Sequence, residues 1–272
     1  NIDEKRDITL RHLLLHNSGL PGYIEFFKDK NIKKKQDVID SILKQNLVYT
    51  PGKGYAYSDL GIILLGSIIE MVSGSSLDSL AQRYIYRPLK MTSTKYNPDS
   101  LLRDMIVPTE YDSTYRGRLL VGEVHDENAW VMGGAAPHAG LFSTARDIAI
   151  YGQMMSNKGE WMGTRYFKDY NIEMFTQRQD MPEGSDRAIG WDTPSQGGRS
   201  SAGDYFSGSS YGHLGFTGTS FWVDPENDVV VVLLTNRVHP TRNKKGIYGI
   251  RRAFHTEVMK EILNHSESVG LN

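Results

Sequence analysis

The chain of 272 residues is long enough for one large domain or two small ones, and it can bury a sizeable core. Its 31 Lys and Arg residues balance 32 Asp and Glu residues, which gives no reason to expect nucleic acid or an anionic membrane as a partner. Because the chain has no cysteine, disulfide bonds, a catalytic thiol and cysteine-ligated zinc are excluded. No apolar run approaches the roughly 18–20 residues that span a bilayer.

Apolar side chains recur at helical spacing in four segments of the first part of the chain. These segments are residues 8–16, 36–46, 60–73 and 77–87. Three of them have recognisable end signals. Thr9 can cap the first helix, Gly74 lies where a C-terminal cap is expected after the third, and Pro88 stops the fourth.

The middle of the chain, residues 97–140, is irregular and rich in turn formers. A helix is expected over residues 145–157, with Ser143 or Thr144 as its cap. An amphipathic helix over residues 246–264 closes the chain.

Strand patterns occur between these last two helices, in residues 188–191, 218–224 and 229–235. The second and third segments flank a turn and predict a hairpin. The run 229–234 has no polar alternation, so we expect a central strand covered on both faces. Helices first, then a sheet, then one helix indicate an α+β protein rather than a parallel βαβ series.

Two short motifs resemble parts of one known active site. Residues 57–59 read Tyr-Ser-Asp directly before the most apolar helix, and residues 212–220 read Gly-His-Leu-Gly-Phe-Thr-Gly-Thr-Ser before the hairpin. They resemble the second and third motifs of the penicillin-recognising serine hydrolases, which include class C β-lactamases, D-alanyl-D-alanine peptidases and related esterases. The similarity runs from Ile8 to Asn236 and is strongest to esterase and peptidase-like members, including β-lactamase-related domains attached to envelope glycosidases.

The resemblance implies a β-lactamase/D-Ala carboxypeptidase-like fold that forms a single unit. A mostly helical region over residues 1–185 would carry the Tyr-Ser-Asp motif, and residues 186–272 would form an antiparallel sheet with the C-terminal helix. In the family, strands upstream of the nucleophile also join this sheet, so an incomplete sheet with an exposed edge is expected. An unpaired apolar edge promotes association. A complementing N-terminal segment or a homo-oligomer is therefore expected to fill it.

The second motif implies roles for Tyr57 and Asp59. Tyr57 matches the tyrosine that relays a proton between a lysine and a serine hydroxyl during acyl transfer. Asp59 stands where the family's Tyr-x-Asn motif has its third residue. Because an ionised carboxylate only accepts hydrogen bonds, Asp59 is expected to organise Tyr57 or attract a lysine, which argues against a β-lactam contact. The alternative is that Asp59 is only the N-cap of the following helix.

The third motif implies a catalytic role for His213 and substrate contacts for its neighbours. His213 would supply a donor, Gly215 would let the backbone approach a substrate, and the N–H of Phe216 would form half an oxyanion hole. Leu214 lacks the hydroxyl that the family's threonine offers to a substrate carboxylate. The alternative is a Gly-rich turn before a hairpin, with a histidine on the surface. His138 is expected near the cleft, without an assigned chemical role.

The family's nucleophile belongs to a Ser-x-x-Lys motif, and the pattern occurs in this chain only at Ser41–Lys44. In the family that motif precedes the segment that here runs from Arg11 to Leu20, so Ser41 is expected to be a chance match. Ser18 is expected to lie in a structural turn. Because the chain begins with Asn1 rather than Met, we expect that an upstream segment with the nucleophile has been removed.

Three functions follow from these patterns. The first is a serine hydrolase of the cell envelope, periplasmic or extracellular, which acts on a small-molecule or peptide ester or amide without metal or organic cofactor; this fragment alone is expected to be inactive. The second is a non-catalytic module that binds peptidoglycan stems or another envelope ligand, which the departures at Asp59 and Leu214 favour. The third is a metallohydrolase that uses His12, His16 and residues 125–127.

Overall fold

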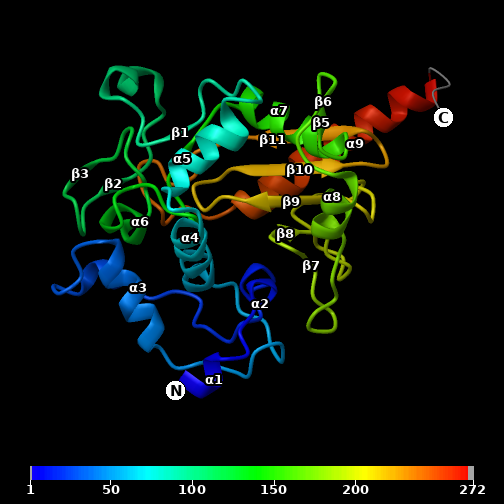
Figure 1. Ribbon diagram of the computed structural model, residues 1–272. Coiled ribbons are helices and arrows are strands. Elements are labelled where there is room, and N and C mark those ends of the chain that lie inside the picture. The colour runs from blue at the N-terminus through cyan, green and yellow to red at the C-terminus, as the bar shows by residue number, and fades with distance from the viewer. Residues whose placement is uncertain (1, 269–272) are drawn as a thin grey trace. The chain divides into compact units, whose positions relative to one another are not determined.

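The structure is a computed structural model, and it describes residues 2–268 (Figure 1). These residues form two compact units. The first runs from the N-terminus to Asp147 and includes the short segments Met181–Ser185 and His239–Thr241. The second comprises the remaining described residues and contains the main sheet.

The first unit is mostly helical, and its long helices begin and end at local signals. Ser58 caps α4, because its Oγ accepts the N–H of Gly61, and Gly74 ends the helix with φ 66°. Asp59 is therefore the first residue of α4 and not its cap. The helices of this unit are α1 (Ile2–Lys5), α2 (Leu10–Leu14), η1 (Phe26–Lys28), α3 (Lys35–Lys44), α4 (Asp59–Ser73), α5 (Leu77–Ala81), η2 (Gln82–Tyr86), η3 (Ser100–Met105) and α6 (Glu127–Val131).

Two small antiparallel pairs complete the first unit. β1 (Lys95–Tyr96) pairs with β4 (Leu141–Phe142), and β2 (Tyr111–Asp112) pairs with β3 (Arg118–Leu119). The middle of the chain is thus irregular, as its turn formers predict. The four helical segments predicted before it are all found, although the fourth is divided into α5 and the π-helical turn η2.

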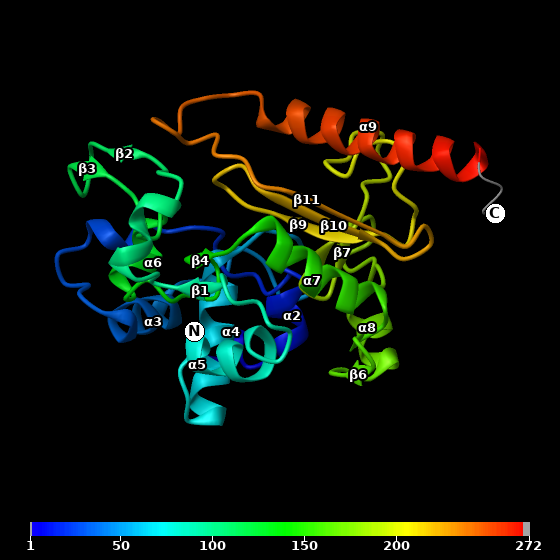
Figure 2. The same cartoon turned by 90° about the horizontal axis from the view of Figure 1, so that it is seen from above.

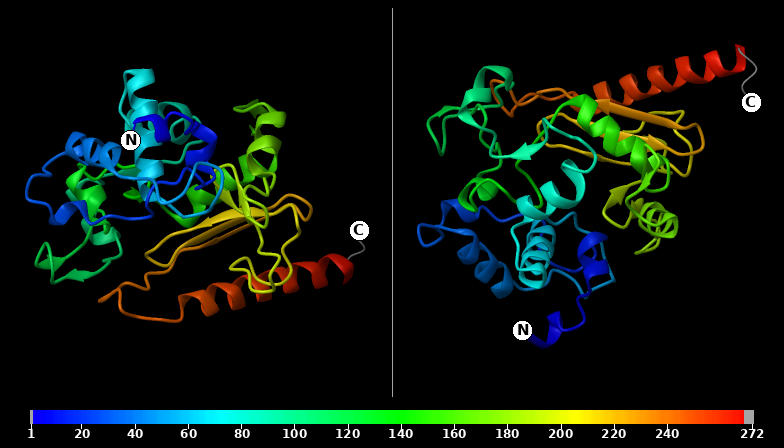
Figure 3. Two further views of the ribbon diagram at one scale, coloured as in Figure 1. Left: turned by 90° about the horizontal axis from the view of Figure 1, so that it is seen from below. Right: turned by 45° about the horizontal axis from the view of Figure 1, so that its top comes forward.

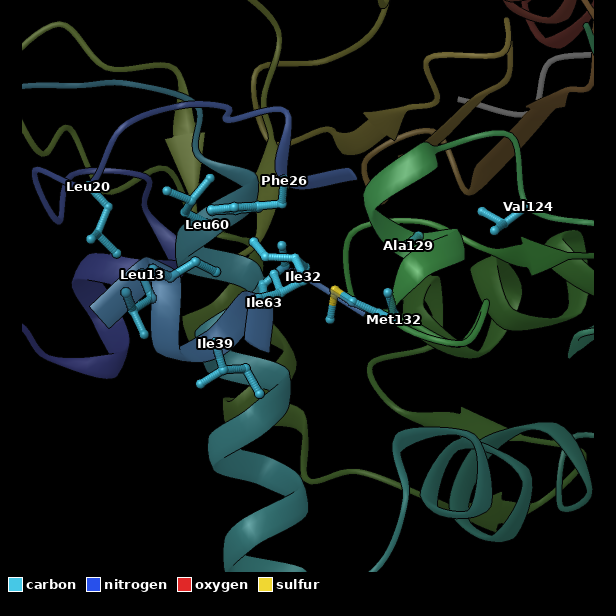
Figure 4. Close-up of a cluster of buried hydrophobic side chains, with 13 residues drawn as sticks. Leu13, Leu20, Phe26, Ile32, Ile39, Leu60, Ile63, Val124, Ala129 and Met132 are labelled. Atoms are coloured by element: carbon cyan, nitrogen blue, oxygen red, sulfur yellow. The ribbon is translucent and has the colours of Figure 1, made fainter. Parts of the chain in front are cut away.

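The core of the first unit lies around α4, where α2, α3, α6 and η1 contribute apolar side chains (Figure 4). Leu60 and Ile63 on α4 have no exposed surface, and Leu13 and Met132 pack into the same cluster. Burial of one such side chain stabilises the fold by roughly 2 kcal/mol. This core fixes the N-terminal end of α4, directly after Tyr57.

The second unit is built on a five-stranded antiparallel sheet in the order β11-β10-β9-β8-β7. The strands are β7 (Arg187–Ala188), β8 (Trp191–Asp192), β9 (Tyr211–Leu214), β10 (Ser220–Asp224) and β11 (Val229–Leu233). The accompanying helices are α7 (Ala145–Ser156), α8 (Asp169–Thr176) and α9 (Ile247–Ser268), and β5 (Glu160–Trp161) pairs with β6 (Thr164–Arg165).

Helices cover both faces of this sheet, with α9 along one face and α7 along the other (Figures 2 and 3). The period of two along β10 divides the side chains between these faces. Trp222 packs with Met259 of α9 in one core cluster. On the other face, a Cβ at Gly152 of α7 would lie 2.7 Å from Phe221, so this glycine allows the helix to approach the sheet closely.

The predicted α+β fold and the predicted hairpin are found, but two details of the sheet differ from the expectations. The run 229–234 was expected to form a central strand, whereas β11 is the last strand of the sheet in the described chain. An unbroken apolar run reports that both faces are covered, and it carries no information about lateral neighbours. Residues 188–191 form the tight hairpin of β7 and β8 instead of one strand, because Gly190 takes φ 81°.

The sheet is open, with β11 and β7 at its two edges in the described residues. Within residues 2–268 no single helix has the length and apolar composition needed to cross a bilayer. The pair formed by α4 and the α5–η2 segment passes that test only as a segment bent by 74°.

Candidate functional site

The segment around Tyr57 is tied to the loop of residues 16–22. The N–H of Ala56 donates to the carbonyl of His16 at 3.0 Å, and the N–H of Asp59 donates to the carbonyl of Gly22 at 2.9 Å. The backbone is therefore fixed on both sides of Tyr57. Tyr57 itself remains 47% exposed to solvent.

His16 lies directly against Tyr57, a contact that the sequence motifs do not predict. Their ring centroids lie 4.2 Å apart, and the Nδ1 atom of His16 accepts the N–H of Ser58 at 3.0 Å. His16 is 3% exposed and adopts φ 55°, in the left-handed region, just after α2. With Nδ1 as an acceptor, the neutral ring carries its proton on Nε2. The phenol ring thus lies against a buried aromatic surface.

Asp59 lies in the electrostatic field of two groups from the second half of this unit. Burial raises the pKa of Asp59, positive charge on His138 opposes this, and Asp126 raises it further. The loop that carries His138 packs closely on α4, since a Cβ at Gly66 would lie 2.6 Å from Pro137. The expectation that His138 takes part in the site stays a prediction, but it is near enough to Asp59 to influence its charge.

His138 contacts Asp126, which the sequence marked only as a member of the 125–127 cluster of the metal hypothesis. Its Nε2 lies 3.1 Å from Oδ1 of Asp126, and its Nδ1 is buried with no hydrogen-bond partner among residues 2–268. Burial alone would raise the pKa of Asp126, but the hydrogen bonds from His138 and from the N–H of Ala129 lower it below the ordinary value. Burial, with the charge of Asp126 as the next cause, raises the pKa of the nearby Tyr23. The surroundings of Asp126 therefore stabilise its ionised carboxylate, whereas those of Asp59 destabilise its ionised carboxylate.

The third motif lies in the second unit, on the inner strand β9. His213 is half-buried there and not a surface residue, and its Nδ1 donates to the carbonyl of Leu214 at 2.9 Å. Burial lowers the pKa of His213; Asp192 counteracts this effect and Arg187 adds to it. Arg187 on β7 and Asp192 on β8 form an ion pair, and Arg187 is buried. His213 is therefore neutral near pH 7.

Gly215 and Phe216 begin the turn that joins β9 to β10. The N–H of Gly215 donates to the carbonyl of Thr219 at 2.8 Å, and the N–H of Gly218 donates back to Gly215 at 3.0 Å. Phe216 is 60% exposed. Leu214 pairs with Ser220 of β10 and is half-buried. We call residues 215–219 the third-motif turn.

The two serines weighed as nucleophiles have other surroundings. Ser18 is buried, and its Oγ accepts the N–H of Leu20 at 3.3 Å, as expected for a structural turn. Ser41 lies on α3, whose first residue Lys35 pairs with Glu70. Glu70 is roughly 16 Å along the axis of α4 from its first residue. These contacts attach α3 to the half of α4 that is remote from Tyr57.

The histidines of the metal hypothesis have partners within the protein. The Nδ1 atom of His12 accepts the N–H of Thr9 at 3.2 Å and closes the cap of α2, while His16 binds the N–H of Ser58. His125 pairs with Glu110 at 2.9 Å in a buried contact. Within residues 2–268 no three His, Cys, Asp or Glu side chains are grouped as metal ligands.

Comparison with known families identifies the family of the chain. The model of the family described as Beta-lactamase matches residues 1–254. The chain belongs to the beta-lactamase family. A relative from Salmonella agona (strain SL483), named "Putative D-alanyl-D-alanine carboxypeptidase", is 34% identical over 265 residues; the match covers 90% of this chain and 61% of the relative. The chain thus spans less than two thirds of that protein.

Solved structures with different descriptions share the fold. EstCE1, described as a hydrolase with promiscuous acyltransferase activity, matches with a TM-score of 0.66 and 18% identity, over 91% of this chain and 72% of its own. The octameric penicillin-binding protein homologue from Pyrococcus abyssi matches with a TM-score of 0.62 and 21% identity, over 94% of this chain and 59% of its own. At these identities the likeness concerns the fold alone.

Proposed function

We propose that this chain belongs to a serine hydrolase that cleaves an ester or amide through an acyl-enzyme. The setting of Tyr57 carries the proposal. The residue is 47% exposed, while hydrogen bonds of Ala56 and Asp59 hold the backbone on both sides. Accessible polar atoms on an immobilised backbone are what general acid–base chemistry requires, because reacting groups must meet at hydrogen-bond distance.

In the proposed reaction, Tyr57 takes the proton of a serine hydroxyl as that oxygen bonds to the substrate carbonyl carbon. It then returns the proton to the alcohol or amine that leaves. A phenol titrates near pH 10 in water, so a neighbouring cation must lower its pKa. The lysine of a Ser-x-x-Lys motif provides that cation, and the carboxylate of Asp59 attracts and orients it.

His213 has a more specific role in this scheme than that of a general donor. Because its Nδ1–H is bound to the carbonyl of Leu214, the neutral ring has its lone pair on Nε2. Burial lowers the pKa of His213, which favours this neutral form. We therefore assign His213 the role of a hydrogen-bond acceptor toward a substrate N–H or hydroxyl, and the N–H of Phe216 that of an oxyanion donor.

The nucleophile of the proposed enzyme lies outside these 272 residues. The Ser-x-x-Lys pattern occurs in the chain only at Ser41–Lys44, and α3 is attached to the remote half of α4. The open edge of β11 can pair with a further strand. In the proposal that strand comes from the segment that carries the nucleophile or from a second copy of the chain. The 272 residues alone are then inactive, with an edge available for association.

The relatives suggest the substrate class and the location. The relative named a D-alanyl-D-alanine carboxypeptidase supports a peptide amide, and an ester is the other substrate class in the proposal. Leu214 cannot offer a hydroxyl to a substrate carboxylate, which favours esters and amides without that group. We propose a location in the cell envelope, which fractionation of the source cells tests directly.

The test compares the 272-residue chain with the full-length gene product. p-Nitrophenyl acetate, a D-alanyl-D-alanine peptide and nitrocefin are the substrates, and intact-mass spectrometry detects the acyl adduct. We expect turnover and an adduct on the upstream serine in the full-length protein only. Tyr57→Phe should abolish turnover, while Tyr55→Phe should not, and Tyr55 is an apt control because it is equally exposed, at 47%. An adduct on Ser41 would refute the placement of the nucleophile.

A non-catalytic binding module remains the second candidate. Asp59 in place of an amide and Leu214 in place of threonine favour it, because both remove groups that contact substrate in the family. If the chain is such a module, we expect the gene to encode no Ser-x-x-Lys motif upstream of residue 1. Calorimetry would then detect binding of a peptidoglycan stem peptide without any covalent adduct.

A further inference from the structure

Every carbonyl oxygen of the third-motif turn accepts a hydrogen bond. The carbonyl of Gly218 accepts the hydroxyl of Thr235 at 2.6 Å, and the carbonyl of Thr217 accepts the N–H of Arg237 at 2.8 Å. The carbonyls of the other three residues, Gly215, Phe216 and Thr219, are bound by arginine side chains. A turn with five engaged carbonyls is far more constrained than a turn whose carbonyls face water.

Arg251 of α9 supplies two of these contacts. Its Nη2 donates to the carbonyl of Gly215 at 2.5 Å and to the carbonyl of Thr219 at 2.6 Å, so it bridges both ends of the turn. Arg251 is 7% exposed, and in residues 2–268 no carboxylate forms an ion pair with it. A buried guanidinium is expensive to desolvate, and here hydrogen bonds to peptide carbonyls offset part of that cost.

Arg237 holds the tip of the turn. Its Nε donates to the carbonyl of Phe216 at 2.8 Å, and its guanidinium lies 4.2 Å from the centroid of the Phe216 ring. This cation–π contact orients the exposed ring as well as the backbone. Arg237 and Arg251 are near enough to repel each other, because Arg237 is one cause of the lowered pKa of Arg251, after burial.

Because the peptide bond is planar, a hydrogen bond that holds a carbonyl also fixes the direction of the next N–H group. In a trans peptide the C=O of one residue and the N–H of the next point in opposite directions. Anchoring the carbonyl of Gly215 therefore fixes the direction of the N–H of Phe216. Anchoring the carbonyl of Phe216 in the same way fixes the N–H of Thr217.

We propose that Arg251 and Arg237 form an arginine clamp that positions the N–H groups of Phe216 and Thr217 toward the developing oxyanion of the substrate. The inference rests on the proposed hydrolase function. Both arginines act through the peptide units and do not touch the substrate. Their two positive charges also favour a negative charge beside the turn, and electrostatic stabilisation of this kind is strongest where donors are fixed before the reaction.

Arg252 provides a matched control on the same helix. It follows Arg251 directly and forms an ion pair with Asp204 at 2.7 Å on the surface. Removal of its guanidinium costs a surface ion pair, which contributes little, and leaves the turn untouched. The pair of substitutions Arg251→Met and Arg252→Met therefore separates the clamp from a general effect on α9.

The kinetic test uses the full-length gene product with p-nitrophenyl acetate. Arg251→Met should lower kcat by about 100-fold with KM nearly unchanged, because misplaced donors weaken the transition state more than the ground state. Arg251→Lys should recover part of this loss, because an ammonium can still donate to one of the carbonyls. Arg252→Met should stay within about twofold of the wild type. Equal losses in the Met variants at positions 251 and 252 would overturn the clamp.

A second measurement needs no activity and therefore separates the clamp from the proposed function. Amide hydrogen exchange of the 272-residue chain should accelerate at residues 216–219 in Arg251→Met and Arg237→Met, and not in Arg252→Met. If the wild-type gene product is inactive but exchange responds as stated, the hydrolase proposal fails while the clamp stands as a feature of the turn. If exchange at the turn is the same in all variants, the clamp is refuted.

Discussion

The Nδ1 atom of His16 accepts the backbone N–H of Ser58 at 3.0 Å, and the same ring lies 4.2 Å from the ring of Tyr57. One buried side chain thus fixes both the backbone and the aromatic face of the second motif. His16 ends α2 in the left-handed region, with φ 55°. Its backbone conformation and its contacts therefore constrain the position independently.

Substitution of His16 should separate these two constraints. His16→Leu leaves the N–H of Ser58 buried without an acceptor and places a branched side chain at positive φ. The unsatisfied N–H costs roughly 1–3 kcal/mol, and Leu is less favourable than His in the left-handed region. His16→Asn keeps a side-chain acceptor and tolerates the left-handed region, so its loss should be the smaller of the two. Urea unfolding measures both variants, and equal losses would show that the hydrogen bond has no net effect.

Asp59 should destabilise the protein at neutral pH. Its pKa is raised in the folded state by burial, so the folded protein retains a proton that the unfolded chain has lost above pH 3.8. Stability therefore falls as pH rises from 3.8 through the folded-state pKa. Asp59→Asn should be more stable than the wild type at pH 7, and the difference should disappear toward pH 3.8. Thermal unfolding at several pH values measures this trend.

Asp126→Asn serves as the counterpart with the opposite sign. The hydrogen bonds from His138 and from the N–H of Ala129 lower the pKa of Asp126, so its charge stabilises the folded state above the ordinary pKa. That stabilisation is lost as pH falls through the folded-state value. The Asn variant should therefore be less stable than the wild type at pH 7. A gain at neutral pH from both Asn variants would contradict the assigned causes.

His255 should make the second unit sensitive to mild acid. Its Nε2 contacts Oγ of Ser220 at 2.8 Å, and burial, assisted by Arg251, lowers the pKa of His255 to about 4. The unfolded chain binds the proton from the ordinary value of 6.5 downward, so stability falls between pH 6.5 and 4. The loss is on the order of 3 kcal/mol. His255→Gln, which does not titrate, should lack this component in pH-dependent unfolding.

Gly66 should tolerate no side chain. A Cβ at this position would lie 2.6 Å from Pro137, so Gly66→Ala must displace the loop that carries His138. Overpacking of this kind costs roughly 1–3 kcal/mol. Val72→Ala on the same helix is a suitable control, because Val72 is 80% exposed. Chemical unfolding compares the two, and a neutral Gly66→Ala would show that the loop yields without cost.

The helices could be predicted because their signals are local. The Thr9 cap, the Gly74 end and the apolar spacing of α4 each act within a few residues, and the structure confirms them. The family resemblance located Tyr57 and His213 by motif. Neither source could reveal how His16 meets Ser58 or how Arg251 meets Gly215, because these contacts join segments far apart in the sequence. Lateral strand order is equally non-local, which explains the error for β11.

The strand that carries His213 is attached unevenly to its neighbours. β9 pairs with β10 at four positions, from Tyr211 to Leu214, but with β8 only through Gly212 and Asp192. A change in β10 is transmitted to the motif through a continuous ladder, whereas a change in the β7–β8 hairpin arrives through one backbone pair and the charges of Arg187 and Asp192. The hairpin can therefore accept insertions and new side chains that alter the surroundings of His213 while its strand stays in register.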